Sequence, residues 1–382
     1  MPSEHRVLVV GGGIGGLSAA SFLAEVEGVE VVVVEAESAL AHHTTGRSAA
    51  QLIFNYGTPP LRALTRAGVG FFRDTPDGLV DAPLLHTRAE LTVATTPEQL
   101  AVLDRLAADA DRDGVRLDRL DSSSAVAEAP LLRPESVLSA VLEPDSADID
   151  VAGLHQAFVR NLRRRGGEIR TDAALVSGRR SGAGWSVSLD DGTDLAVDSI
   201  VDTAGAWGDT VAERCGVAPI GLTPMRRTAF MVRSPFDGSA GWPLVADADH
   251  AWYCKPDGRQ FLCSPADETP EAPTDSKPDE LDVALAIDRI NTHTTLGIRS
   301  VASAWAGQRT FTPDRTMAIG PDADEPRFLW CVGQGGTGIQ SAPAAGALVA
   351  HLTTGSPDAW TAASVEPLDD ATIAALDPAR FR

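Results

Sequence analysis

The sequence predicts an α/β protein in which a doubly wound domain with a parallel sheet is interrupted by a second domain built on an antiparallel sheet. Three observations support this prediction. The chain opens with strand and helix patterns around a glycine turn, its middle third shows short strand signals separated by turns, and its last third returns to a strand, a glycine-rich turn and a helix of small residues. Alternating strands and helices are typical of parallel sheets, whereas closely spaced strands and turns are typical of antiparallel ones.

The first elements form a strand–helix–strand unit. A β-branched run at Val7–Val10 is followed by the glycine-rich residues 11–16 and by helix-forming residues from Leu17 to Ala24. A second β-branched run at Val29–Val34 ends in Glu35. Continuous apolar runs of this kind indicate parallel strands that are buried on both faces.

Further elements alternate along the rest of the chain. Helices are expected at Pro60–Phe72, Thr96–Asp111, Ser123–Glu128, Val151–Arg165 and Ser341–Thr353, and strands at 89–94, 168–170, 174–177, 185–189, 199–203 and 327–332. Asp150 is a suitable N-cap for the helix that follows it. Segments 1–82, 148–220 and 305–382 are assigned to the first domain, and segments 83–147 and 221–304 to the inserted one.

Composition excludes several classes of function. The net charge is −21 and the only lysines are Lys255 and Lys277, which argues against a nucleic-acid partner. The four cysteines lack a CxxC spacing, so a reduced compartment and no metal site are expected. Five glycines interrupt the apolar stretch Val7–Ala24, so it is not expected to span a membrane. These observations predict a soluble, cytoplasmic protein.

The spacing Gly11-x-Gly13-x-x-Gly16 matches the dinucleotide fingerprint. The first glycine turns the chain, the second lets the backbone approach a pyrophosphate, and the third lets the helix pack on the strand. Glu35 lies 19 residues past Gly16, at the end of the second strand, where a carboxylate would accept the ribose hydroxyls of an adenosine. A glycine-rich hairpin is the alternative.

Three further segments favour FAD over NAD. They are the polar, small-residue loop around Thr45, the strand end at Thr203–Trp207, and the late glycine-rich turn at 335–338, whose backbone donors could approach a flavin ring. The residues expected to bind the cofactor are Gly11, Gly13, Ile14, Gly16, Glu35, Ala36, Thr44, Thr45, Arg47, Ser48, Ala49, Ala50, Leu175, Val176, Ala204, Gly205, Trp207, Arg309, Gly335, Gly336, Thr337, Gly338, Ile339 and Gln340.

The order of these motifs resembles the D-amino acid oxidase superfamily, and within it the bacterial D-arginine dehydrogenases. The resemblance runs from Val7 to Gln340 and is carried by segments 45–50, 56–59, 83–85, 147–150, 226–227, 253–257, 305–309 and 335–340. It implies a glutathione-reductase-type, D-amino acid oxidase-like fold, with a Rossmann-like domain that binds FAD. Some relatives attach the flavin covalently through a Cys or His, but Ser48 and its neighbours offer no such nucleophile at the matching loop, so non-covalent FAD is expected. Gln51, Ile53 and Thr337 depart from the D-arginine dehydrogenase pattern, so its substrate is not transferred to this chain.

The resemblance also implies roles for five residues. Arg227 and Arg309 would hold the substrate carboxylate, Tyr253 would donate a hydrogen bond to it, Tyr56 would lie on a mobile loop over the site, and Glu90 would face the far end of the side chain. For Arg227 and Arg309, guanidinium groups bind carboxylates well. Alternatives stay open from the residues alone: Arg226 could replace Arg227, Glu90 could lie on a solvated strand face, and His42 and His43 are interpreted as polar surface.

The implied reaction is oxidation of a D-amino acid, including one with a cationic side chain. Hydride would pass from the substrate Cα to flavin N5, and the imino acid would hydrolyse to a 2-oxo acid and ammonia. The electron acceptor could be a quinone, another carrier or dioxygen. The similar sarcosine oxidases carry a lysine near the flavin that promotes the reaction with oxygen. The matching position in this chain falls near Cys263 and holds no lysine, which favours a dehydrogenase. Oxidation of glycine, sarcosine or another secondary amino acid is the first alternative, and a non-catalytic flavin-binding module is the second.

Overall fold

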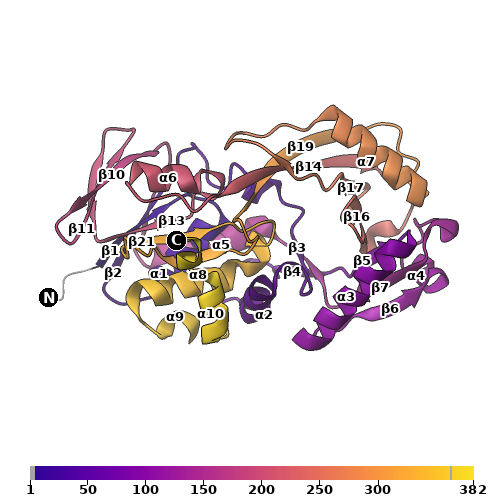
Figure 1. The fold of residues 1–382 in the computed structure, drawn as a ribbon, viewed down its shortest axis with the longest axis horizontal. Helices are drawn as coiled ribbons and strands as arrows, with labels where there is room; N and C mark the ends of the chain where they lie inside the picture. The colour runs from indigo at the N-terminus through magenta and orange to yellow at the C-terminus, as the bar shows by residue number, and fades with distance from the viewer. Residues whose placement is uncertain (1–4, 362–363) are drawn as a thin grey trace.

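A six-stranded sheet forms the centre of the first lobe of the molecule (Figure 1). The computed structural model describes residues 5–361 and 364–382. The strand order is β20 (Ala318–Pro321), β21 (Phe328–Val332), β13 (Ser199–Asp202), β1 (His5–Val10), β2 (Val29–Val34) and β9 (Glu168–Arg170). All neighbours pair in parallel except β20 and β21. The predicted strand–helix–strand start and the parallel sheet are confirmed.

The two faces of this sheet are covered differently. Val7 and Val9 of β1 point into a core shared with the helices α1 (Ile14–Leu23), α2 (Pro59–Arg73), α5 (Val151–Arg164) and α8 (Gly338–Thr354). The alternate residues Leu8 and Val10 pack against the small sheet of β10 (Leu175–Ser181), β11 (Gly184–Leu189) and β12 (Asp194–Val197), together with α6 (Gly208–Arg214). A β-strand that is apolar at every position is therefore buried on both sides.

Helix α8 brings the end of the chain onto its beginning. Gly346 packs against Ser18 of α1, and a Cβ at Gly346 would lie 2.2 Å from the Ser18 hydroxyl. The Ser18 hydroxyl also donates to the carbonyl of Ala342. This close helix pair fixes the glycine turn that precedes α8 near the turn that precedes α1. Two short helices, α9 (Asp358–Thr361) and α10 (Asp370–Leu376), follow.

A nine-stranded sheet forms the second lobe. Its order is β18 (Thr269–Pro270), β14 (Thr223–Arg233), β17 (Gln260–Ser264), β16 (Tyr253–Asp257), β15 (Leu244–Asp247), β5 (Glu90–Ala94), β7 (Ser139–Glu143) and β6 (Asp118–Asp121), and β19 (Ser303–Phe311) also pairs with β14. Only β15 and β5 pair in parallel among these described strands. The antiparallel sheet expected for the middle third is thus present, extended by strands from residues 90–143.

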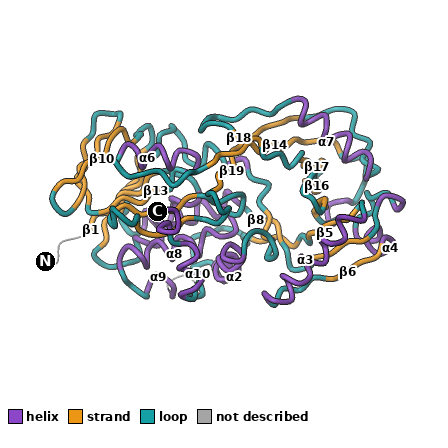
Figure 2. Tube along the Cα trace, viewed as in Figure 1, coloured by secondary structure: helices purple, strands orange, loops and turns teal. Residues whose placement is uncertain are grey.

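Helices lie on both faces of the nine-stranded sheet. Helices α4 (Ser122–Glu128) and α7 (Glu280–His293) pack on one face with Leu91 and Phe230. Helix α3 (Pro97–Asp113) packs on the other face, against Ala94 and Val141. In Figure 2, α2 of the first lobe lies at the border with the second lobe, beside α3.

The border between the lobes has its own small sheet. Strand β8 (Ala147–Ile149) pairs with β3 (Gln51–Leu52) and with β4 (Leu85–Thr87). We keep the division at residues 82, 147, 220 and 304 as a proposal. Strand β19, which the last boundary cuts, pairs with β14 along its whole length. Among the described residues, no helix combines the length and apolar character needed to cross a membrane.

Candidate active site

A cavity of about 410 Å³ extends from the glycine turn after β1 to the strands β14, β16 and β19. It joins parts of both lobes. The predicted cofactor residues in its wall are Gly11, Gly13, Ile14, Glu35, Ala36, Thr44, Thr45, Arg47, Ser48, Ala49, Leu175, Ala204, Gly205, Trp207, Arg309, Gly335, Gly336, Gly338 and Ile339. Arg227 and Tyr253 line the same cavity. One continuous space therefore adjoins both predicted sites.

The glycine turn has the geometry that a dinucleotide needs. Gly11 has φ +113°, and a Cβ at Gly16 would lie 1.9 Å from the Gly11 carbonyl oxygen, so both positions require glycine. The Glu35 carboxylate accepts from the backbone N–H of Gly12 at 2.7 Å and of Glu37 at 2.9 Å. A carboxylate can accept about four hydrogen bonds, so Glu35 retains capacity for two ribose hydroxyls. The adenosine end of FAD fits these residues.

The loop at residues 44–49 is fixed to β19 rather than left free. The Thr44 hydroxyl donates to the Gln308 carbonyl at 2.7 Å, and Arg47 Nη1 donates to the Ala306 carbonyl at 2.8 Å. On the other side, the Thr45 hydroxyl accepts from the Ile14 N–H at 3.0 Å. The loop therefore links the glycine turn to the strand that carries Arg309.

The late glycine-rich turn closes the far wall of the cavity. Gly335 and Gly336 have φ +52° and +96°. A Cβ at Gly336 would lie 2.8 Å from the guanidinium of Arg309, so glycine there leaves room for that side chain. The backbone of this turn, just before the N-terminus of α8, can face a flavin ring, as the sequence suggested.

Strand register places the two candidate arginines on one face of the second sheet. Arg227 on β14 pairs with Gly307 on β19, and Arg309 follows Gly307 by two residues. Because side chains alternate along a strand, Gly307 and Arg309 share a face, and Arg227 shares it with them. Gly307 opposite Arg227 contributes no side chain. The result is two guanidinium groups beside the same cavity.

Both tyrosines of the chain adjoin this pair. Arg309 Nη1 donates to the Tyr56 hydroxyl at 3.1 Å. Tyr253, on β16, lines the cavity with Arg227 and Arg309. We call Tyr56, Arg227, Tyr253 and Arg309 the arginine–tyrosine cluster.

The electrostatics of the cluster favour an anion. Burial, and then repulsion by Arg309, hold the pKa of Arg227 below its ordinary value. Burial also opposes the charge of Arg309, but Tyr56, Tyr253 and Glu268 outweigh it, so the pKa of Arg309 is raised. Both groups are still cationic at neutral pH. A carboxylate between them would offset the repulsion between two like charges that the fold holds together.

The structure distinguishes Arg227 from its neighbour. Arg226 points away from the cavity and pairs with Asp282 at 2.7 Å and Asp267 at 3.3 Å. Arg227 has a side chain only 11% exposed, donates from Nε to the Asp267 carbonyl at 2.8 Å and pairs with Glu268 at 3.0 Å. Of the two alternatives, only Arg227 reaches the cavity.

Glu90 lies on the site face of the second sheet but outside the cavity wall. Tyr253 pairs with Ala246, Ala246 pairs with Thr92, and Glu90 precedes Thr92 by two residues. Two strand spacings, about 10 Å, therefore separate Glu90 from the strand of Tyr253. Glu90 is half-buried, and its pairing partner on β7 is Glu143. Burial, and then the nearby Glu143 carboxylate, raise the pKa of Glu90 to about 8.

Two residues that the sequence did not single out adjoin the cluster. The ring of His250 lies 5.9 Å from the Tyr56 ring in an edge-on arrangement. Burial, and then Arg227 and Arg309, lower the pKa of His250, so it is neutral at neutral pH. Glu268 pairs with both Arg227 and Arg315. The sequence feature that could have pointed to His250 is its position three residues before Tyr253.

Five of the predicted cofactor residues do not line the cavity. Val176 is 50% exposed, because the bulge between Leu175 and Ser177 turns it to solvent. Gln340 is buried and hydrogen-bonds to the backbone of Ile53 at 3.0 and 3.1 Å. The other three, Gly16, Ala50 and Thr337, are buried.

His42 is exposed, in agreement with its interpretation as polar surface, whereas His43 is half-buried; both also line the cavity. His43 contacts Glu37 at 2.9 Å, and its ring lies 4.7 Å from that of Trp207. Other cavity residues that the sequence did not indicate include Gly15, Thr203, Gln308 and Gln334. Thr203 and Gln308 lie inside motifs that had been recognised, and Gln334 directly precedes one.

The six-stranded sheet, the glycine turn after β1 and the inserted antiparallel sheet together form the arrangement typical of FAD-dependent oxidoreductases. The family model "DAO: FAD dependent oxidoreductase" matches residues 6–352. The chain belongs to this family, and FAD is its cofactor.

Individual relatives are distant. FAD-dependent oxidoreductase domain-containing protein 1 of Bos taurus is 25% identical, and the match covers 92% of this chain and 81% of that one. 4-Methylaminobutanoate oxidase (formaldehyde-forming) of Paenarthrobacter nicotinovorans is 25% identical, with 94% of this chain and 44% of that one covered. The structure of L-proline dehydrogenase from P. horikoshii superposes with a TM-score of 0.83 at 19% identity and covers 100% of this chain and 98% of its own. That last likeness shows the fold.

Proposed function

We propose that this enzyme oxidises the carbon–nitrogen bond of an amino acid, with a D-amino acid as the first candidate substrate. The arginine–tyrosine cluster supports this proposal. Two guanidinium groups on adjacent strands, with two phenolic hydroxyls beside them, form a site suited to a carboxylate. A protein that only stored FAD would not need such a site.

The residues of the cluster would act by positioning the substrate. Bound FAD would supply the hydride acceptor. Arg227 and Arg309 would fix the carboxylate, and the neutral amine and the Cα–H bond would then be held against the cofactor cavity. Because the carboxylate and the cofactor occupy fixed sides of Cα, the hand of the substrate decides which group faces the flavin. This geometry supports selection between enantiomers.

The electron acceptor is not identified by the cluster, and we propose a quinone, another carrier or dioxygen. Side-chain preference would depend on Glu90. Its carboxyl is half-buried on the site face and has a pKa of about 8, so it is mostly neutral at pH 7. Attraction of a cationic side chain would therefore require that Glu90 lose its proton. This property favours uncharged side chains at neutral pH and cationic ones at higher pH.

A secondary amino acid is the second candidate substrate. The names of two similar proteins, 4-methylaminobutanoate oxidase and L-proline dehydrogenase, refer to secondary amines. The arginine–tyrosine cluster would serve both candidates equally, because it contacts the carboxylate and not the nitrogen. The nitrogen substituent therefore distinguishes them experimentally.

The test is anaerobic mixing of the yellow holoenzyme with D-, L- and N-methyl amino acids, proline and glycine, followed by the loss of oxidised-flavin absorbance. Bleaching by D-amino acids with primary amines would support the first candidate, and bleaching by N-methylated substrates the second. The matched variants are Arg227→Gln, which should slow bleaching at low substrate by roughly 30-fold, and Arg226→Gln, which should change it by less than about threefold. If none of these amino acids bleaches the flavin, the proposal is wrong.

A further inference from the structure

The segment that carries Tyr56 is anchored at its backbone by a buried carboxylate. Glu143 at the end of β7 accepts from the N–H of Phe54 at 2.7 Å and from the N–H of Asn55 at 3.2 Å. It also accepts from the Ser146 hydroxyl at 2.8 Å. Glu143 is 1% exposed, so these three donors take the place of water around a buried acid.

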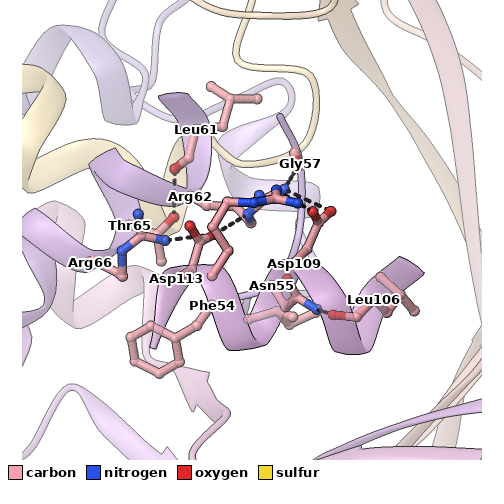
Figure 3. Close-up of polar contacts among 12 residues, drawn as sticks. Phe54, Asn55, Gly57, Leu61, Arg62, Thr65, Arg66, Leu106, Asp109 and Asp113 are labelled. Carbon is pink, nitrogen blue, oxygen red and sulfur yellow. Dashed lines mark hydrogen bonds and ion pairs between the residues drawn. The ribbon is translucent and has the colours of Figure 1, made fainter. Parts of the chain in front are cut away.

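A buried arginine holds the other side of the same segment (Figure 3). Arg62 Nη1 donates to the Gly57 carbonyl at 3.0 Å, directly after Tyr56. Arg62 Nε contacts Asp113 at 2.5 Å, and Nη1 lies 3.5 Å from Asp109. Arg62 is 3% exposed. The guanidinium therefore bridges the Tyr56 segment and two aspartates of α3.

A third contact joins the segment to α3. The side-chain N–H of Asn55 donates to the Leu106 carbonyl at 2.8 Å (Figure 3). Helix α3 and Glu143 both belong to the second lobe, whereas Arg62 lies on α2 of the first. The segment 53–58 is thus anchored by hydrogen bonds to residues of both lobes.

We propose that Arg62 is a positioning residue for the substrate carboxylate. Arg62 does not reach the cavity wall. It holds the Gly57 carbonyl against α3, and this sets where the neighbouring Tyr56 hydroxyl meets Arg309. The inference rests on the proposed function in one respect: the arginine–tyrosine cluster binds a carboxylate.

Arg66 provides a matched comparison. It follows Arg62 by one helical turn and contacts Asp113 at 3.1 Å, with a side chain 32% exposed. Arg66 pairs with Asp113, whereas Arg62 contacts both Asp113 and the Gly57 carbonyl. Removing Arg66 therefore weakens the ion pairs of α3 without removing the bond to Gly57. Removing Arg62 weakens both.

The experiment compares Arg62→Met, Arg66→Met, Tyr56→Phe and the double variant Arg62→Met/Tyr56→Phe as FAD-loaded enzymes. Calorimetry with benzoate, a carboxylate without an amine, measures the affinity of the arginine–tyrosine cluster for a carboxylate. Hydrogen exchange of residues 53–58 measures the anchoring. We expect Arg62→Met to lower the affinity for benzoate about fivefold and to speed hydrogen exchange in this segment. Arg66→Met should change the affinity less than about twofold.

The double variant separates positioning from general destabilisation. If Arg62 acts through Tyr56, its removal should have little further effect on affinity once the hydroxyl is gone. Additive losses, or equal effects of Arg62→Met and Arg66→Met, would overturn the proposal. Should Arg62→Met fail to fold, Arg62→Lys replaces it, because a single ammonium nitrogen lacks the planar fork whose Nε and Nη1 reach Asp113 and Gly57 from two separate atoms.

Failure of the two proposals is distinguishable. If the native enzyme binds no benzoate, the carboxylate clamp of the proposed function is contradicted. Hydrogen exchange then decides the anchoring role alone: faster exchange in Arg62→Met but not in Arg66→Met supports it, and unchanged exchange refutes it.

Discussion

Arg309 Nη1 lies 3.1 Å from the hydroxyl of Tyr56. The two residues come from opposite ends of the chain, and their contact joins the segment after β3 to β19. Arg309 is thereby oriented before any substrate arrives, which reduces the side-chain entropy that binding must overcome.

Tyr56→Phe should therefore reduce affinity without abolishing the reaction. The variant loses the contact that orients Arg309 and a hydroxyl that can bond the carboxylate. An effect of about 1 kcal/mol, roughly a fivefold rise in KM, is expected with a smaller change in kcat. Steady-state kinetics on the best substrate of the panel would measure it. A kcat that falls as steeply as kcat/KM would contradict a binding role.

Arg227→Gln should have a much larger effect than Arg226→Gln. Arg227 reaches the cavity, whereas Arg226 pairs with Asp267 and Asp282. Loss of a charge-assisted bond to the carboxylate would cost about 2 kcal/mol, a factor of roughly 30 in kcat/KM. The adjacent variant should stay within about threefold of the native value. Equal losses in the two variants would indicate a structural rather than a binding effect.

The preference for cationic side chains should depend on pH through Glu90. Its pKa is about 8, raised first by burial and then by Glu143. Below that pH the carboxyl is neutral, and above it the carboxylate can pair with a cation. The ratio of kcat/KM for D-lysine to that for D-norleucine should rise about fivefold between pH 7 and 9, since an ion pair of this kind is worth about 1 kcal/mol.

The ratio removes the titration of the α-amine, which both substrates share. In Glu90→Gln it should stay constant across the same range. A ratio that does not change with pH in the native enzyme would show that Glu90 does not face the side chain.

Glu35→Gln should weaken the binding of FAD. Glu35 accepts from the Gly12 and Glu37 amides and lies in the cavity wall, where its remaining lone pairs can accept the ribose hydroxyls. Replacing the carboxylate by an amide should raise the Kd for FAD by roughly 10-fold. Glu37→Gln is the control, because Glu37 also lines the cavity but pairs with His43. Fluorescence titration of the apoprotein with FAD gives the Kd of each variant. Equal Kd values for Glu35→Gln and Glu37→Gln would contradict the assignment of Glu35 to the ribose hydroxyls.

The parts of the fold that the sequence predicted are those set by local pattern. The valine-rich runs at 7–10 and 31–34 predicted strands buried on both faces, and the spacing of Gly11, Gly13 and Gly16 predicted the tight turn between them. The amphipathic helix after Asp150 begins where its N-cap was expected, with Asp150 accepting from the Gly153 amide.

The parts that sequence could not supply depend on long-range pairing. The choice between Arg226 and Arg227 required the register of β14 against β19, because alternation alone leaves both faces open. Glu143 was overlooked because its partners, Phe54 and Asn55, are 88 or more residues away. The side chain of Val176 is exposed because a bulge shifts the alternation by one residue. Neither a pairing register nor a bulge leaves a reliable mark in a single sequence.

The pairing of β14 with β19 also has a consequence for biosynthesis. Arg227 and Arg309 are 82 residues apart in the chain, and no hairpin turn brings their strands together. The glycine turn that makes room for Arg309 comes later still, at residues 335–336. A nascent chain can form the βαβ unit of residues 5–34 early, but Arg227 and Arg309 can meet only after β19, which ends at Phe311, has left the ribosome. The glycine turn after β1 is thus made early, whereas the two arginines and the glycine turn beside Arg309 come together late.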